Sequence, residues 1–138
     1  MSMKINKVIE TCIYSSDLES MKKFYVDILG LLPIEEERDK LIFLKAGKSM
    51  LLIFNPFRTR NDNNMLPTHG AMSPPSCIHL ALEIKKHDYQ AWKELLFRNS
   101  ISIEKEVDWN NKAKSLYFRD PAGNLIEFIT EGGWPVES

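Results

Sequence analysis

The chain has 138 residues, of which 43% are hydrophobic, and its 18 Lys and Arg nearly balance its 19 Asp and Glu, for a formal net charge of -1. A chain of this length buries a hydrophobic core without needing disulfides or metal to fold. The charge balance excludes the broad electropositive field that nucleic acid or an anionic lipid surface requires. No segment approaches the roughly 18 to 20 continuous apolar residues that span a bilayer, and residues 1–9 lack a signal-peptide core. We therefore expect a cytoplasmic protein that binds neither nucleic acid nor membrane.

The first half of the chain predicts a strand, a helix and a strand hairpin. Residues 8–14 are rich in β-branched side chains, and Ser16 to Glu19 has the S-x-x-E pattern of a capping box, which predicts a helix start near residue 17. Apolar residues then recur at spacings of three and four, and Gly30 stands where a helix C-terminus favours positive φ. Further strands are expected over residues 32–37, 41–45 and 49–55.

The second half repeats this order. Residues 77–84 alternate in polarity, Asp88 can cap a helix, and residues 101–107 resume extended character. Asp120, Pro121 and Gly123 then occupy positions that a type I turn favours. The turn joins two strands expected over residues 115–119 and 124–130. We infer an internal duplication of about 50 to 60 residues, too low in copy number for a solenoid.

The two halves are separated by residues 56–76, which hold four prolines and three asparagines and are not expected to form an element with a buried face. Connections longer than about 12 to 15 residues commonly serve as lids, binding arms or linkers. The two cysteines, Cys12 and Cys77, adjoin predicted strands without a CxxC pattern. We expect both cysteines to be reduced packing residues rather than a disulfide or a catalytic thiol.

Three ionisable residues interrupt strands that are otherwise suited to burial: Glu10, His79 and Glu127. Strand alternation puts His79 and Glu127 on the side opposite their apolar neighbours. A buried carboxylate is unfavourable without a cation or a hydrogen-bond donor. One imidazole and two carboxylates suit a divalent ion such as Mn, Fe, Ni, Co or Zn, with coordination positions left open. The pattern predicts a shared metal site, and the alternative of separate hydrogen-bonded or solvent-facing side chains stays open.

Three segments carry more specific motifs: Asp17 with Phe24-Tyr25 and Leu29-Gly30-Leu31, then His79 to Leu82, then Tyr117 to Glu127. Together they resemble the vicinal oxygen chelate superfamily, which includes glyoxalase I, extradiol dioxygenases, and fosfomycin- and bleomycin-resistance proteins. The resemblance implies an α+β fold in which two βαβββ modules form a curled mixed sheet with an enclosed cleft, within a homodimer. It implies one domain over residues 1–138, with modules at about 5–57 and 76–131 and a linker at about 58–75.

The same resemblance implies metal ligands at Glu10, His79 and Glu127. The position that matches Glu127 in the first half falls at about Leu52, which cannot bind a metal, so three of four possible ligands remain. Glu10 or Glu127 is expected to move a proton during catalysis. Substrate contacts are expected from side chains along the cleft and from the linker, with packing roles as the alternative: Phe54, His69, Trp109, Ser115 and Tyr117.

The leading interpretation is a glyoxalase-like enzyme, dependent on a divalent metal, that acts on a small oxygenated metabolite by lyase, isomerase or oxygenase chemistry. The alternative is a metal-free protein that sequesters a small molecule, as bleomycin-resistance proteins do. A third interpretation, thiol transfer to an epoxide antibiotic, requires a cationic pocket, for which Lys112, Lys114 and Arg119 are the candidates. The fold alone does not choose among them.

Overall fold

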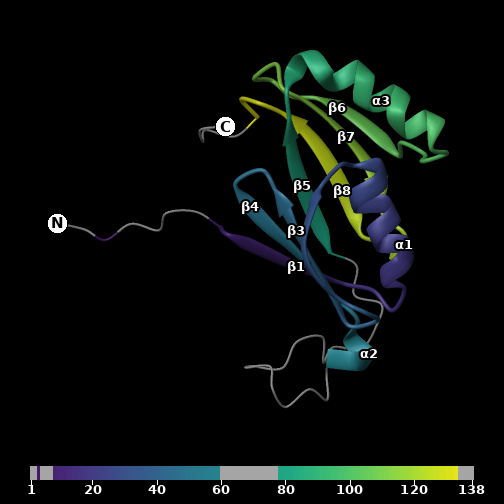
Figure 1. The fold of residues 1–138 in the computed structure, drawn as a ribbon. Helices are drawn as coiled ribbons and strands as arrows, with labels where there is room; N and C mark the ends of the chain where they lie inside the picture. Colours follow the sequence, from purple (N-terminus) through teal and green to yellow (C-terminus); the bar gives the residue numbers. More distant parts are fainter. Residues whose placement is uncertain (1–2, 4–7, 60–77, 134–138) are drawn as a thin grey trace. The chain divides into compact units, whose positions relative to one another are not determined.

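The computed structural model describes residue 3, residues 8–59 and residues 78–133. The chain divides into two compact units, Met1–Ser76 and Cys77–Ser138. Each unit holds one four-stranded mixed sheet, built in the order strand, helix, three strands (Figure 1). The α+β fold with paired βαβββ modules is therefore confirmed. Most of the predicted linker lies outside the described residues, as do His69 and Cys77.

The N-terminal sheet has the strand order β1-β4-β3-β2. Strand β1 pairs in parallel with β4, and the other two pairings are antiparallel. The expected strands are confirmed with small shifts at their ends; the first begins at Glu10 because its pairing with β4 begins there. The strands are β1 (Glu10–Tyr14), β2 (Leu32–Glu37), β3 (Leu41–Ala46) and β4 (Ser49–Phe54).

The first helix, α1 (Leu18–Lys22), is capped by Asp17 instead of Ser16. The Asp17 carboxylate accepts the backbone N–H of Ser20 at 3.1 Å. The Asp17 N–H is in turn bonded to the hydroxyl of Ser15 at 3.0 Å, which places Asp17 at the helix start. The capping box predicted from Ser16 was wrong because the carboxylate one residue later supplies the acceptor for the first free N–H groups.

Two variants distinguish capping by Asp17 from capping by Ser16. We expect Asp17→Ala to lower the melting temperature by a few degrees and Ser16→Ala to leave it unchanged. The backbone N–H of Ser20, and then its hydroxyl, lower the pKa of Asp17 from its ordinary value of 3.8. The stabilisation is therefore present above that ordinary pKa and is lost as the pH falls through the lower folded value. Thermal melts across the acid range measure both effects, and an equal loss in Ser16→Ala would contradict the assignment.

After α1 the helix widens into a π-helical segment, η1 (Lys23–Ile28). The N–H of Leu29 bonds to the carbonyl of Phe24, five residues back, at 3.0 Å. The wide turn accompanies two consecutive buried aromatic side chains, Phe24 and Tyr25, which pack edge to face at 5.0 Å. Gly30, at φ 81°, ends the helix as predicted. Apolar spacing thus predicts the helix and its buried face, and it does not distinguish a π turn from an α turn.

The segment after β4 begins with a short helix, α2 (Pro56–Thr59), in which Pro56 and Thr59 are buried. Asn55 supports its first turn: its side-chain oxygen accepts the N–H of Phe57 at 3.0 Å, and its carbonyl accepts the hydroxyl of Thr59 at 3.1 Å. The prediction that residues 56–76 form no element with a buried face was therefore wrong at their start, because proline suits the first helical position.

The C-terminal sheet has the order β5-β8-β7-β6, with β5 and β8 parallel. Asp88 takes the N-cap position of α3, as predicted, but its side chain makes no cap hydrogen bond within the described chain. A 3-10 turn already leads into the helix and gives Asp88 helical backbone angles. The elements are β5 (His79–Ile84), η2 (Lys86–Asp88), α3 (Tyr89–Arg98), β6 (Lys105–Asp108), β7 (Lys114–Arg119) and β8 (Leu125–Thr130).

The apolar face of this sheet packs under α3. The Trp92 ring of the helix lies 4.8 Å from the Phe128 ring of β8, and the Phe118 ring of β7 lies 4.9 Å from Phe128. Phe118 and Ile126 are fully buried. The predicted alternation is confirmed, and it leaves the opposite face of the sheet for the polar residues.

The turn between β7 and β8 is closed by its own side chains. The N–H of Gly123 bonds to the carbonyl of Asp120 at 2.9 Å, as a β-turn requires. The Asp120 carboxylate accepts the N–H groups of Ala122 and Asn124, both at 2.9 Å, and the Asn124 side-chain amide at 2.8 Å. Asn124 then accepts the N–H of Ile78 at 3.0 Å. The turn therefore holds the residue that precedes His79.

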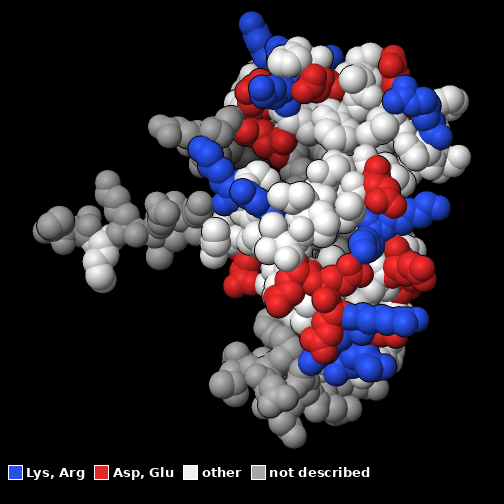
Figure 2. Space-filling view, in the orientation of Figure 1, with Lys and Arg blue, Asp and Glu red and all other residues white. Residues whose placement is uncertain are grey.

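Lys and Arg are interspersed with Asp and Glu on the face that Figure 2 presents, in keeping with the balanced charge of the sequence. Among the helices of the described residues, none has the length and apolar character needed to cross a membrane.

Candidate metal centre

Strand register brings four of the predicted site residues onto one face of the C-terminal sheet. Glu127 of β8 is paired with Ala81 of β5 and with Tyr117 of β7. Paired residues project to the same face, and so do residues two apart along a strand. His79 therefore shares this face with Glu127 and Tyr117, and Ser115 joins them from β7.

His79 and Glu127 are in direct contact. The Nε2 atom of His79 lies 3.1 Å from a carboxylate oxygen of Glu127, and its Nδ1 atom lies 3.0 Å from the carbonyl oxygen of Leu125. Both neighbours are hydrogen-bond acceptors, whereas a neutral imidazole has one N–H. If Nδ1 donates to the carbonyl, the Nε2 lone pair faces the carboxylate. That arrangement is favourable with a second proton on the ring or with a cation held between the two atoms.

Glu127 is 7% exposed, so its carboxylate depends on nearby donors. The hydroxyl of Ser115 donates to its second oxygen at 2.5 Å, a length typical of a hydrogen bond to a charged acceptor. Ser115 is fully buried, and its oxygen accepts the indole N–H of Trp109 at 2.8 Å. One carboxylate oxygen is thus bonded to Ser115, and the other is directed at His79.

Tyr117 adds a protonated hydroxyl beside this carboxylate. Its ring stacks on the imidazole of His79, with centroids 6.2 Å apart and planes inclined by 29°. Burial, followed by the charge of Glu127 and a hydrogen bond to it, raises the pKa of Tyr117, while Ser115 lowers it in part. The phenol therefore keeps its proton at neutral pH and can donate.

A cavity of about 460 Å³ opens beside these groups. Three predicted residues line it, Trp109, Tyr117 and Glu127, and four others were missed by the sequence analysis. The missed residues belong to the loop before β7, to β8 and to the end of the described chain, and no motif marks them: Asn110, Asn111, Ile129 and Gly133. Alternation along β8 could have indicated Ile129, because it lies two residues from Glu127.

The His79 and Glu127 pair fits a divalent cation. Two ligand atoms bound at about 2.1 Å on perpendicular bonds lie about 3.0 Å apart, which is close to the spacing of Nε2 and the carboxylate oxygen. Metal-binding histidines usually donate their other N–H to a carbonyl or carboxylate, as His79 can to Leu125. Within residues 8–59 and 78–133, no cluster gathers three or more His, Cys, Asp or Glu side chains. Two of the three predicted ligands, His79 and Glu127, are therefore spaced to bind one metal ion. The third predicted ligand belongs to the other unit.

Glu10 is the third predicted ligand, and it is exposed at the start of β1 in the N-terminal unit. In each unit the parallel pair has the same register: His79 is paired with Leu125, as Glu10 is with Met50. Two residues further along, Leu52 takes the place that Glu127 has in the C-terminal sheet. Glu10 thus occupies the position in its sheet that His79 occupies in the other sheet. That Glu10 binds the same metal ion as His79 and Glu127 stays a prediction.

Two further residues of the N-terminal unit were singled out by the sequence. Phe54, a predicted substrate contact, is 1% exposed and packs its ring on Tyr14 and Phe43 at 6.4 and 5.7 Å, which favours a core role. Cys12 is a free cysteine. Burial, and then the charge of Glu10, raises the pKa of its thiol. A protonated thiol is a weak nucleophile, in keeping with the packing role expected of Cys12.

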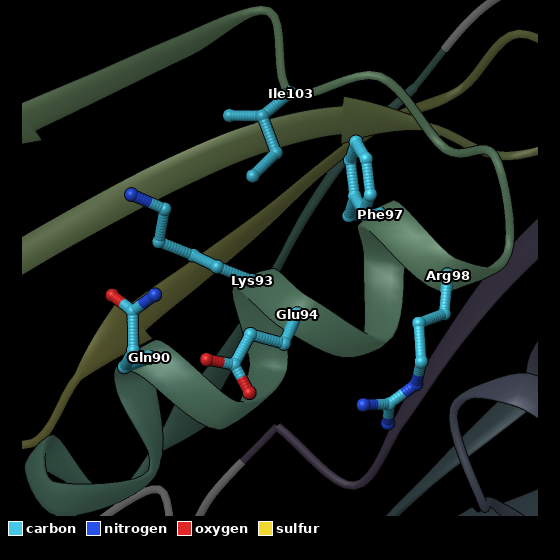
Figure 3. Close-up of a pocket in the computed structure, with 6 residues that line it drawn as sticks. All are labelled: Gln90, Lys93, Glu94, Phe97, Arg98 and Ile103. Carbon is cyan, nitrogen blue, oxygen red and sulfur yellow. The ribbon is translucent and has the colours of Figure 1, made fainter.

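Two of the three cationic residues considered for an anionic substrate, Lys114 and Arg119, have structural partners. Arg119 donates to Glu104 and to the carbonyl of Gly123, each at 3.1 Å, and the Lys114 ammonium lies 3.9 Å from Asp108. A second cavity, of about 440 Å³, lies along α3, and neither His79 nor Glu127 lines it (Figure 3). It is lined by Gln90, Lys93, Glu94, Phe97, Arg98 and Ile103.

Comparison with known proteins agrees with this architecture. The sequence model of the Glyoxalase/Bleomycin resistance protein/Dioxygenase superfamily matches residues 4–128. Metallothiol transferase FosB of Staphylococcus epidermidis is 30% identical over 129 residues, which are 93% of this chain and 84% of that protein. The crystal structure of lactoylglutathione lyase from Agrobacterium tumefaciens matches with a TM-score of 0.87 and 31% identity, over 97% of this chain and 100% of that chain. The chain belongs to the Glyoxalase/Bleomycin resistance protein/Dioxygenase superfamily.

Proposed function

We propose that the protein is a divalent-metal-dependent enzyme that acts on a small oxygenated substrate, with Glu10, His79 and Glu127 as the metal ligands. The observation that carries this proposal is the contact between His79 and Glu127 at 3.1 Å, with the opposite edge of the imidazole held by a carbonyl. The adjoining cavity of about 460 Å³ offers room for a small molecule.

The proposal gives roles to the metal and to residues of both units. A bound divalent ion would polarise an oxygen of the substrate and stabilise the negative charge that develops on it. Tyr117 keeps its proton, which it shares in a hydrogen bond with Glu127, and the rings of Tyr117 and Trp109 provide aromatic walls for the cavity. Both oxygens of Glu127 already face partners, Ser115 and His79. Glu10 is therefore the better candidate for accepting a proton from the substrate.

The relatives favour chemistry that involves a thiol compound. One is named as a metallothiol transferase, and the other as a lyase of lactoylglutathione, which is a thioester of a thiol peptide. We therefore propose lyase or thiol-transfer chemistry ahead of oxygenase chemistry. The metal-free sequestering protein remains the second candidate, supported by the aromatic lining of the cavity by Trp109 and Tyr117.

Metal analysis tests the proposal directly. Protein purified without a His tag is expected to carry, or to bind on titration with Mn²⁺ or Ni²⁺, one equivalent of metal per chain. His79→Ala and Glu127→Ala are expected to weaken that binding by about 100-fold or more, because each removes a ligand. Glu35→Gln, in an exposed part of β2, is the matched carboxylate control and is expected to bind as the unaltered protein does.

Unchanged stoichiometric binding in Glu127→Ala would reject the assignment of the ligands. Binding of an aromatic compound by protein that takes up no metal would favour the sequestering function. Light scattering on the same samples tests the homodimer that we also propose, and cell fractionation tests the cytoplasmic location.

A further inference from the structure

The hydroxyl of Ser115, which the sequence suggests as a substrate contact, already has two partners within the protein. The Ser115 side chain is fully buried. Its single hydroxyl proton is donated to Glu127 at 2.5 Å, and its oxygen accepts the indole N–H of Trp109 at 2.8 Å. A serine hydroxyl has one proton to donate, so no donor remains for a substrate.

The direction of the two hydrogen bonds is fixed by chemistry. An indole nitrogen can only donate, and an ionised carboxylate can only accept. The hydroxyl between them must therefore accept from Trp109 and donate to Glu127. Trp109 thus orients the hydroxyl of Ser115, and Ser115 holds one oxygen of Glu127 so that the other faces His79 at 3.1 Å.

We propose that Trp109 and Ser115 are positioning residues, which set the orientation of the Glu127 carboxylate for metal binding. The inference rests on the proposed function, and it reassigns Ser115 from substrate contact to support of a ligand. Groups that hydrogen-bond to metal ligands commonly contribute 10- to 100-fold to metal affinity, because a free carboxylate rotates among several orientations. Trp109 is 43% exposed and lines the cavity, and its indole N–H is hydrogen-bonded to Ser115. It therefore connects the cavity wall, through Ser115, to the metal ligand Glu127.

Trp109 gives the proposal a spectroscopic signature. The chain has three tryptophans, and Trp109 is connected to Glu127 through one hydroxyl. Binding of Zn²⁺, which does not quench by paramagnetism, is expected to shift the tryptophan emission. Trp109→Phe is expected to remove that shift while calorimetry still detects binding of Zn²⁺, several-fold weaker than in the unaltered protein.

The decisive experiment is calorimetric titration of the full chain with Zn²⁺ in matched serine variants. Ser115→Ala is expected to bind Zn²⁺ about 10- to 100-fold more weakly. Ser115→Thr, which keeps a hydroxyl, is expected to recover most of that loss. Ser16→Ala, at an exposed position outside both sheets, is the control and is expected to bind normally. Circular dichroism of each variant verifies the fold before titration.

The outcomes separate the two proposals. If the unaltered protein binds Zn²⁺ and both Ser115→Ala and Trp109→Phe bind it with the same affinity, the positioning role is overturned. The metal-dependent function is then still supported. Absence of binding in the unaltered protein overturns both. If Ser115→Ala fails to fold, Trp109→Phe decides alone, because it removes the indole N–H without altering the buried hydroxyl: normal affinity with an unchanged emission shift overturns the positioning role.

Discussion

Asp120→Ala is expected to lower the free energy of unfolding by about 3 kcal/mol, because it leaves buried donors without an acceptor. Asp120 is 4% exposed and accepts the N–H of Ala122, the N–H of Asn124 and the side-chain amide of Asn124. Asn124 is itself 2% exposed. Water therefore has little access to replace the lost hydrogen bonds.

Urea denaturation followed by circular dichroism measures this effect. Asp108→Ala is the matched control, because its side chain is 83% exposed and its ion pair with Lys114 spans 3.9 Å. We expect that control to change stability by less than about 0.5 kcal/mol. A loss of similar size in both variants would contradict the role given to the turn. Since Asn124 also accepts the N–H of Ile78, Asp120→Ala is further expected to weaken metal binding by His79.

Phe118→Ala is expected to cost about 3 to 5 kcal/mol of stability, the range typical of a buried phenylalanine truncated to alanine. The Phe118 ring is fully buried and packs edge to face on Phe128 at 4.9 Å. Phe118→Leu keeps most of the volume and is expected to cost less than about 2 kcal/mol. Urea denaturation of the two variants tests this prediction: the midpoint should fall further for Phe118→Ala than for Phe118→Leu, while the dependence of the unfolding free energy on urea stays unchanged.

A substitution at Phe118 also tests whether stability and metal binding can be changed independently. It follows Tyr117 in β7 and projects to the opposite face, under α3. The folded fraction of Phe118→Leu is therefore expected to bind metal with unchanged affinity. A large loss of metal affinity in that variant, with the fold intact, would contradict the division of the sheet into a packing face and a site face.

Much of this fold follows from local patterns of the sequence. Alternation in residues 77–84 and 124–130 predicts two strands with His79 and Glu127 opposite the core, because side chains alternate across a strand. Gly30 predicts the helix end, because glycine adopts positive φ without steric cost. These features depend on residues that are close together in the chain.

Other features depend on contacts that local patterns do not contain. Asp17 competes with Ser16 for the same N–H groups, and only the backbone angles decide between them. The bond from Ser115 to Glu127 joins residues 12 apart, and it requires the register of β7 against β8. The cavity residues Asn110 and Asn111 lie in a loop, where no periodicity indicates which side chains face inward.

The shared register of the two sheets has a consequence for how a substrate would be recognised. The halves of the chain offer unlike groups at matching positions: a carboxylate at Glu10 against an imidazole at His79, and an aliphatic chain at Leu52 against a carboxylate at Glu127. A symmetric set of donors would accept a small molecule in either of two orientations. In the proposed site, such unlike groups would distinguish the two ends of a substrate, and the differences between the duplicated halves would then give its binding one orientation.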